Sequence, residues 1–118
     1  MSLHNLSRAI EVVVNETNPR VTARHVIVFL MTAEAGNEGL TQQTIMDFFG
    51  DALPKGSISK LTKRLRRIED TGADGEIRYG YDLIQWIDDR SAIEGAYGYF
   101  LLTEKGKRIY KQVKRLAG

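Results

Sequence analysis

The chemistry that this chain is equipped for is concentrated in residues 54–68, and it is the binding of a polyanion. The segment holds six Lys or Arg residues and no Asp or Glu, although the whole chain carries 17 basic and 15 acidic residues. A solvated helix also carries Lys and Arg, but its face normally mixes both signs of charge. Because the positive charges are segregated here, the segment is typical of a surface that contacts nucleic acid.

The apolar residues of this segment predict a helix. They recur every three or four positions and so share one buried side: Ile58, Leu61, Leu65 and Ile68. Ser57 is suited to cap the amino end, so the helix is expected over about 57–68, with Lys60, Lys63 and Arg67 on the opposite side. Its polar side chains are suited to bonding phosphates or base edges. The candidate DNA-contacting residues are Ser57, Ser59, Lys60, Thr62, Lys63, Arg64 and Arg67.

Three helices are expected before the basic helix. Apolar residues repeat at helical spacing over 3–16, which predicts an amphipathic helix. Thr22 can cap a nearly all-apolar helix over 22–35, the expected centre of the core. Thr41 can cap a short helix over 41–49. Three side chains of that short helix are expected to face inward: Ile45, Phe48 and Phe49.

The segments after the basic helix predict a turn, a hairpin and a last helix. Residues 70–75 are a cluster of turn formers, and aromatic and β-branched residues predict a β-hairpin over about 79–102. A basic amphipathic helix is expected over 103–117. The expected fold class is mainly α with a β-hairpin wing (α+β), a winged helix-turn-helix, in one domain over residues 1–118. In such a fold the basic helix enters the major groove and the wing reaches the adjacent backbone or minor groove.

Three stretches of this sequence resemble the MarR-type winged helix-turn-helix transcriptional regulators. The Leu-Thr-Gln-Gln-Thr-Ile-Met-Asp-Phe-Phe stretch at 40–49 is similar to their supporting helix, and 55–65 to their recognition helix. The Phe-Leu-Leu-Thr-Glu-Lys-Gly-Lys-Arg stretch at 100–108 is similar to the return strand of the wing and the following helix start. The resemblance extends over roughly residues 20–116. It implies a sequence-specific regulator of double-stranded DNA, and it implies that Arg90, in Asp88-Asp89-Arg90, contacts DNA at the wing tip.

The same resemblance implies a homodimer. MarR-type proteins usually dimerise through an amino-terminal helix packed with two carboxy-terminal helices, whereas here a single helix precedes Gly118, so we expect a reduced interface. The candidate dimer residues lie on the two terminal helices: Leu3, Leu6, Ile10, Val13, Ile109, Val113 and Leu116. Packing of these helices on the domain of the same chain is the alternative, and the sequence does not choose between the two.

The predicted hairpin supports an alternative function. It carries the acidic residues Asp82, Asp88, Asp89 and Glu94, which repel phosphate unless they point away from it. Its aromatic residues are of the types favoured at protein interfaces: Tyr79, Tyr81, Trp86, Tyr97, Tyr99 and Phe100. The alternative function is therefore a winged-helix protein-interaction module that docks on replication or transcription machinery.

Composition and motifs disfavour several other classes. The sequence has no cysteine, which excludes disulfides and thiol-based sensing, and His4 and His25 are too far apart in sequence to suggest a zinc site. We find no phosphate loop, nucleophile elbow or His-carboxylate set, so we expect no enzyme and no cofactor or metal. No stretch approaches a membrane span and no signal peptide opens the chain, so we expect a cytoplasmic protein without membrane partners. A small-molecule effector is compatible with the resemblance, but no residue specifies one.

Overall fold

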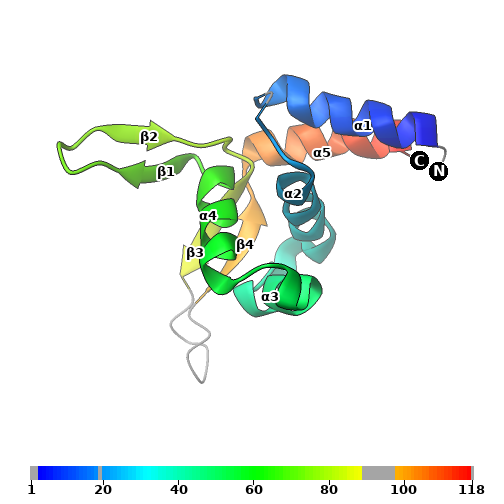
Figure 1. Cartoon of the computed structure of the whole chain (residues 1–118). Coiled ribbons are helices and arrows are strands. Elements are labelled where there is room, and N and C mark those ends of the chain that lie inside the picture. The colour runs from blue at the N-terminus through cyan, green and yellow to red at the C-terminus, as the bar shows by residue number, and fades with distance from the viewer. Residues whose placement is uncertain (1–2, 19, 89–97, 118) are drawn as a thin grey trace.

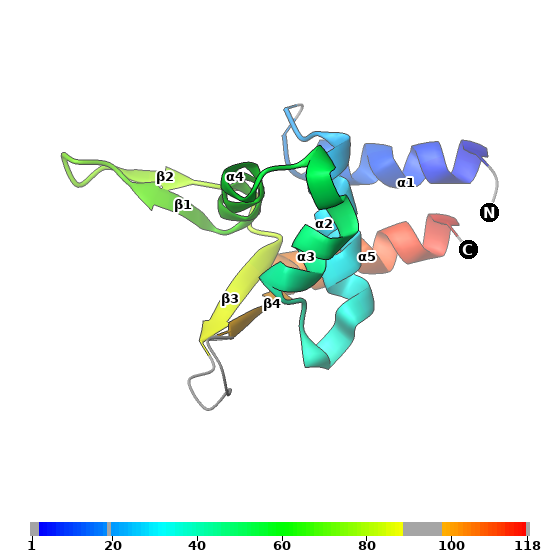
Figure 2. The same ribbon diagram turned by 60° about the horizontal axis from the view of Figure 1, so that its bottom comes forward.

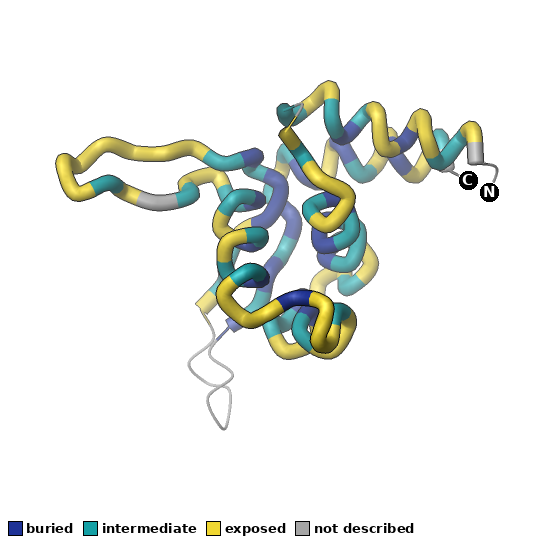
Figure 3. Tube along the Cα trace, in the orientation of Figure 1, coloured by how far each residue is buried: buried dark blue, intermediate teal, exposed yellow. Residues whose placement is uncertain are grey.

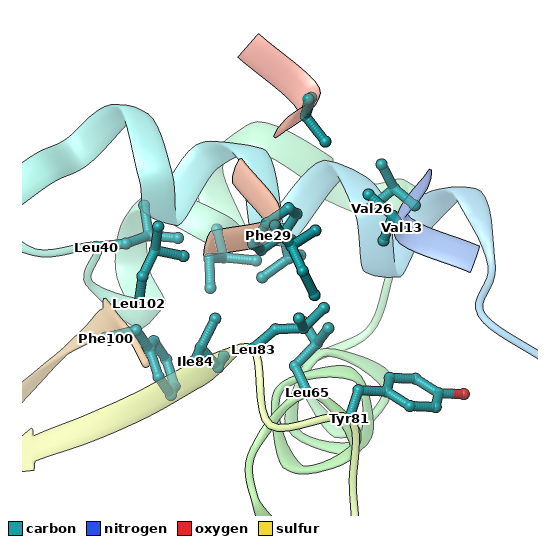
Figure 4. Packing of buried hydrophobic residues seen from close by; sticks show 14 of the residues in the cluster. Val13, Val26, Phe29, Leu40, Leu65, Tyr81, Leu83, Ile84, Phe100 and Leu102 are labelled. Carbon is teal, nitrogen blue, oxygen red and sulfur yellow. The ribbon is translucent and has the colours of Figure 1, made fainter. Parts of the chain in front are cut away.

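The computed structural model describes residues 3–18, 20–88 and 98–117. Within these ranges the chain is a mixed α+β structure with five α-helices and two antiparallel two-stranded sheets (Figure 1). The expected α+β class is confirmed. The buried apolar residues form one cluster at the meeting point of the helices and the second sheet, as Figure 3 shows by burial and Figure 4 by side chain.

The terminal helices α1 (Leu3–Glu16) and α5 (Glu104–Ala117) lie side by side, and their bounds agree with the expected ones (Figures 1 and 2). Val13, Ile109 and Val113 are buried within the single chain. Packing inside one copy therefore accounts for these three dimer candidates. Of the others, Ile10 is 39% exposed, Leu6 and Leu116 are half-buried, and the side chain of Leu3 lies outside the described part of the structure.

The helix α2 (Ala23–Ala35) is the centre of the core, as predicted. The Thr22 side chain accepts a hydrogen bond from the backbone N–H of His25, which confirms the predicted cap. Val28 and Phe29 of this helix are fully buried. Because α2 contacts α4, β4 and α5, it fixes the positions of the elements that carry the basic residues.

The short helix α3 (Gln42–Phe49) lies between the 3-10 turns η1 (Gly36–Glu38) and η2 (Gly50–Ala52), and Thr41 caps it as predicted. Ile45 is buried and Phe49 packs at the edge of the core. The expectation that Phe48 faces inward is wrong, since its side chain is 59% exposed. The side of α3 that packs on the core is formed by Ile45, Met46 and Phe49, and Phe48 lies on the other side of Ile45 from Met46.

The hairpin of β3 (Ile84–Asp88) and β4 (Gly98–Leu102) occupies the last part of the predicted wing. Ile84 pairs with Leu102 and Asp88 with Gly98, in continuous antiparallel register. Leu40 adds two backbone hydrogen bonds to Phe100, which ties the start of α3 to this sheet. The tip of the hairpin lies outside the described residues, and so do Arg90 and Tyr97.

A second hairpin was not predicted. The strands β1 (Ile68–Thr71) and β2 (Ile77–Tyr79) form an antiparallel ribbon, here called the arm, which extends away from the body of the molecule (Figures 1 and 2). Of the turn formers expected at 70–75, residues 72–75 connect these two strands, whereas Asp70 and Thr71 belong to β1. Tyr79 belongs to the arm and not to the wing, which corrects the predicted start of the wing hairpin.

Backbone hydrogen bonds at Gly80 and beyond fix the base of the arm. The N–H groups of Gly80, Tyr81 and Leu83 donate to the carbonyls of Arg67, Arg64 and Leu65, respectively. A Cβ on Gly80 would overlap the carbonyl oxygens of Arg64 and Arg66, so only glycine allows this close approach. The chain leaving α4 is thereby held against the segment that leads into β3.

Candidate nucleic-acid interface

The basic helix α4 spans Lys55–Leu65, two residues earlier at its start and three earlier at its end than predicted. Its N-cap is Pro54 and no side chain caps it, so the predicted cap at Ser57 is wrong. The backbone N–H of Ser57 instead donates to the carbonyl of Pro54. The N–H groups of Lys55 and Gly56 have no protein partner among the described residues. Such groups at a helix start are suited to binding an anion.

One face of α4 is open to solvent and positively charged. Gly56, Lys60 and Lys63 follow one another at four and three residues, and all three are exposed, so they share this face. A Cβ built on Gly56 would meet no atom within 4 Å. No described acidic residue forms an ion pair with Lys60 or Lys63. The face therefore offers two uncompensated cations and an unobstructed approach to the helix start.

Not all predicted contact residues reach this face. Ser57 and Ser59 are half-buried on its two sides. Thr62 is only 5% exposed and its hydroxyl donates to the carbonyl of Ser59, so its assignment as a DNA contact does not agree with the structure. Thr62 lies between the apolar positions of the helix, and its methyl group lets it pack there while the hydroxyl bonds the backbone.

Because α4 ends at Leu65, Arg67 and Ile68 do not lie on it as predicted. Arg66 is the C-cap in an extended conformation, because the carbonyls of residues 64–66 bond the segment that precedes β3. Arg67 is exposed but follows the helix, and Ile68 is 45% exposed in β1, so neither continues the helical pattern. The expected helical stripe therefore ends at Leu65.

Arg64 is engaged in a side-chain cluster that sequence reasoning missed. Its Nη1 donates to Oε2 of Glu69 at 2.8 Å, and its Nε donates to the Tyr81 hydroxyl at 3.4 Å. Its guanidinium also lies 5.4 Å from the centre of the Tyr81 ring. The hydrogen bonds to Tyr81 and to Glu69 raise the pKa of Arg64 above its ordinary value. The positive charge of Arg64 is thus partly neutralised within the protein. In the sequence, the only indication of this was Glu69, five residues later.

His25 belongs to the same cluster. The backbone N–H of Thr22 donates to Nδ1 of His25 at 3.1 Å, completing a reciprocal cap with the Thr22 hydroxyl. The His25 ring meets the Tyr81 ring edge-on, with 5.5 Å between ring centres. Burial and, to a lesser extent, the nearby charge of Arg64 lower the pKa of His25. The cluster therefore connects the start of α2 to α4 and to the base of the arm.

Two hollows flank α4. The larger, here called the α4 groove, has a volume of ≈ 950 Å³ and lies between α4 and the start of α2. It is lined by Thr22, Ala23, Arg24, His25, Leu53, Ser57, Lys60, Leu61, Lys63, Arg64 and Glu69. The smaller, of ≈ 160 Å³, separates α4 from the β3–β4 hairpin and includes Ser59, Lys63 and Arg66.

The part of the chain that the structure describes contains neither a metal-binding cluster nor a membrane-spanning helix. No group of three or more His, Cys, Asp or Glu side chains there is arranged to hold a metal ion. No described helix is long and apolar enough to cross a membrane.

No family model, curated protein or solved structure matches this chain.

Proposed function

We propose that this chain is a sequence-specific, double-stranded DNA-binding transcriptional regulator built on a winged helix-turn-helix of MarR type. One observation carries the proposal: α4 has an open face with Gly56, Lys60 and Lys63, and no described acid is paired with either lysine. A helix with such a face fits the major groove, where cations meet phosphates and guanine edges.

The elements around α4 support this proposal by their order. In the proposed winged helix-turn-helix, α2 and α3 hold α4 at a fixed angle, and the β3–β4 hairpin is the wing (Figure 2). Lys60 and Lys63 bind phosphates or guanines, and the free N–H groups of Lys55 and Gly56 bind a phosphate at the helix start. Ser57, Ser59, Arg64 and Arg67 have secondary roles at the edges of the contact. A DNA contact by Arg90 remains a prediction from the resemblance.

The first experiment is selection of a random double-stranded DNA library on the purified protein, followed by sequencing of the retained molecules. We expect enrichment of a defined sequence, because base-edge contacts discriminate by about 1–3 kcal/mol for each good pair. Retention of DNA without enrichment of any sequence would show that the protein binds DNA non-specifically and would contradict a sequence-specific regulator. Absence of retention would contradict DNA binding altogether.

Matched charge reversals test the assignment to α4. Lys60→Glu with Lys63→Glu should abolish detectable binding of the selected DNA. Lys111→Glu with Lys114→Glu is the control, because these lysines are also exposed, three residues apart and helical, and the pair changes the net charge equally. An equal loss in both variants would show that net charge, and not the α4 face, governs binding.

We also propose that the regulator acts as a homodimer on an inverted repeat. Two copies of α4 would then be ~34 Å apart, one turn of DNA. Within the described surface of the terminal helices, Leu6, Ile10 and Leu116 are the candidates that still have exposed area. Enrichment of an inverted repeat in the selection would support the dimer, and a single unrepeated site would count against it.

A protein-interaction module is the second candidate. The exposure of Tyr79, 66%, and of Phe48, 59%, favours it, since exposed aromatic side chains often anchor interfaces. Tyr81 and Phe100 no longer contribute, because both are buried. Partner capture that survives Lys60→Glu with Lys63→Glu but not Tyr79→Ser would favour this candidate over the regulator.

A further inference from the structure

The arm carries an apolar face that no described residue covers. Five large hydrophobic side chains are exposed in the described part of the protein, and three belong to the arm: Ile68 and Ile77, each 45% exposed, and Tyr79. Ile68 is directly opposite Tyr79 in the strand register, and Ile77 is two residues from Tyr79. All three therefore lie on one face of the ribbon. A two-stranded ribbon is marginally stable alone, so this face is suited to packing against another surface.

The charge of the arm indicates the chemistry of that surface. Asp74 and Glu76 are exposed at its turn, and Glu69 lies at its base. Carboxylates at the tip oppose the approach of a phosphate backbone. The surface that fits the arm is therefore apolar in its centre and basic at its edges.

The α4 groove has these two properties. Leu53, Leu61 and Ala23 supply an apolar lining, and Arg24, Lys60 and Lys63 supply cations. The remaining charged pair in the groove, Arg64 and Glu69, is joined by its own salt bridge. The remaining titratable group is His25, whose pKa is lowered by burial and by Arg64. The groove thus presents three cations whose charge no described acid neutralises.

Of the residues that line the α4 groove, the arm of the same chain contributes only Glu69 at its base. It leaves the molecule at the edge of the groove, where Glu69 lines it, and extends outward (Figures 1 and 2). The backbone hydrogen bonds of Gly80, Tyr81 and Leu83 fix this direction. We propose that the arm of one copy docks in the α4 groove of a second copy. Because arm and groove are adjacent in each copy, a two-fold axis between them permits a reciprocal exchange that closes a dimer.

Docking of the arm covers Lys60 and Lys63. Self-association then competes with any polyanion on the same face, and a dimer of this kind is a storage form that DNA displaces. The competition rests on the proposed function, whereas the docking itself does not.

Cysteine cross-linking tests the docking directly, because the chain has no native cysteine. Ala73 at the turn of the arm and Ala23 in the groove are both exposed and uncharged. A mixture of Ala73→Cys protein and Ala23→Cys protein, treated with a short bismaleimide, should give a cross-linked dimer joined between these two positions. Ala73→Cys mixed with Gln112→Cys, an exposed position on α5, is the control and should give none. No cross-link, or an equal yield in the control, would overturn the proposal.

Charge reversal provides a second measurement that does not depend on a cross-linker. Asp74→Lys with Glu76→Lys, and separately Lys60→Glu with Lys63→Glu, should each weaken self-association in sedimentation velocity by at least about tenfold. The variant with all four changes should recover self-association, because the arm is then basic, the groove is acidic, and the two attract each other again. The variants are compared in the Ile10→Asp background, so that a dimer through the terminal helices does not contribute. Self-association there that neither reversal changes, or its absence at the highest soluble concentration, would contradict the proposal.

The two proposals fail separately. Asp74→Lys with Glu76→Lys leaves α4 intact, so DNA should still bind, and bind more tightly when the storage dimer is lost. If the cross-link forms but no variant retains DNA, the proposed regulator is wrong and the arm exchange stands. If DNA is retained but no cross-link forms, the arm exchange is wrong and the proposed regulator stands.

Discussion

At His25, protonation is coupled to folding. Burial and the charge of Arg64 lower its pKa in the folded chain, while the unfolded chain has a His pKa of about 6.5. The unfolded state therefore takes up a proton first as the pH falls, so the free energy of unfolding decreases below about pH 6.5 until the folded state is protonated too. Protonation also removes the Nδ1 acceptor from the N–H of Thr22.

We expect thermal denaturation to show a lower melting temperature at pH 5.5 than at pH 7.5. His25→Gln is the matched variant, because glutamine can complete the same cap but does not titrate. Its melting temperature should change less over this interval. An equal pH dependence in both proteins would assign the effect to other groups.

Two substitutions of Gly56 distinguish its effect on stability from its effect on DNA binding. Nothing occupies the space where its Cβ would lie, so Gly56→Ala should leave the fold intact and raise the free energy of unfolding by up to about 1 kcal/mol. If a phosphate approaches the start of α4, Gly56→Glu should weaken DNA binding more than tenfold, roughly, through its charge and bulk. Chemical denaturation and DNA titration measure the two effects. Unchanged DNA affinity in Gly56→Glu would place the contact away from the helix start.

At the scale of elements, the base of the arm depends on Gly80. An added methyl group would overlap two backbone carbonyl oxygens that α4 and its C-cap contribute. Gly80→Ala should therefore reduce the free energy of unfolding by about 1–3 kcal/mol, the usual cost of overpacking. Urea denaturation checks this, with Gly56→Ala as the glycine control in open space. A stable Gly80→Ala protein would mean that the arm can move away from α4 without cost.

The terminal helices offer a comparable contrast between neighbours. Val13 is buried between α1 and the rest of the core, whereas Ile10 is 39% exposed on the same helix. Val13→Asp should prevent folding, because it buries an unpaired carboxylate. Ile10→Asp should remain folded by circular dichroism, and it should lower the oligomeric state only if the terminal helices form a dimer. A folded Val13→Asp protein would contradict the packing of α1 on α5.

The elements that the sequence predicted well are those governed by local signals. Thr22 and Thr41 cap helices where their side chains indicated. The end of α4 was missed because Ile68 keeps the helical spacing, while the hydrogen bonds that end the helix come from residues 80–83. β1 was overlooked for another reason: the sequence pattern assigns Ile68 to the end of the basic helix and Tyr79, its partner, to the start of the wing. Burial of Thr62 and exposure of Phe48 depend on neighbouring elements, which periodicity alone does not specify.

The molecule as a whole concentrates its positive charges. Cations gather on α4 and α5, whereas the exposed carboxylates are spread over most of the described chain, with Asp74 and Glu76 at the turn of the arm. With a formal net charge of only +2, attraction to DNA must come from this arrangement and not from the total. Of the two basic helices, the proposal assigns the DNA contact to α4.

The salt dependence of DNA affinity distinguishes the two helices quantitatively. The logarithm of the affinity should fall linearly with the logarithm of the salt concentration, with a slope of about −0.9 for each phosphate neutralised. Single replacements, Lys60→Ala and Lys63→Ala, should each reduce the size of that slope by about 0.9 if the lysine binds a phosphate. Lys111→Ala and Lys114→Ala on α5 should leave it unchanged. Affinity that falls while the slope stays constant would assign Lys60 or Lys63 to a base edge, and a reduced slope in the α5 variants would assign the DNA contact to α5.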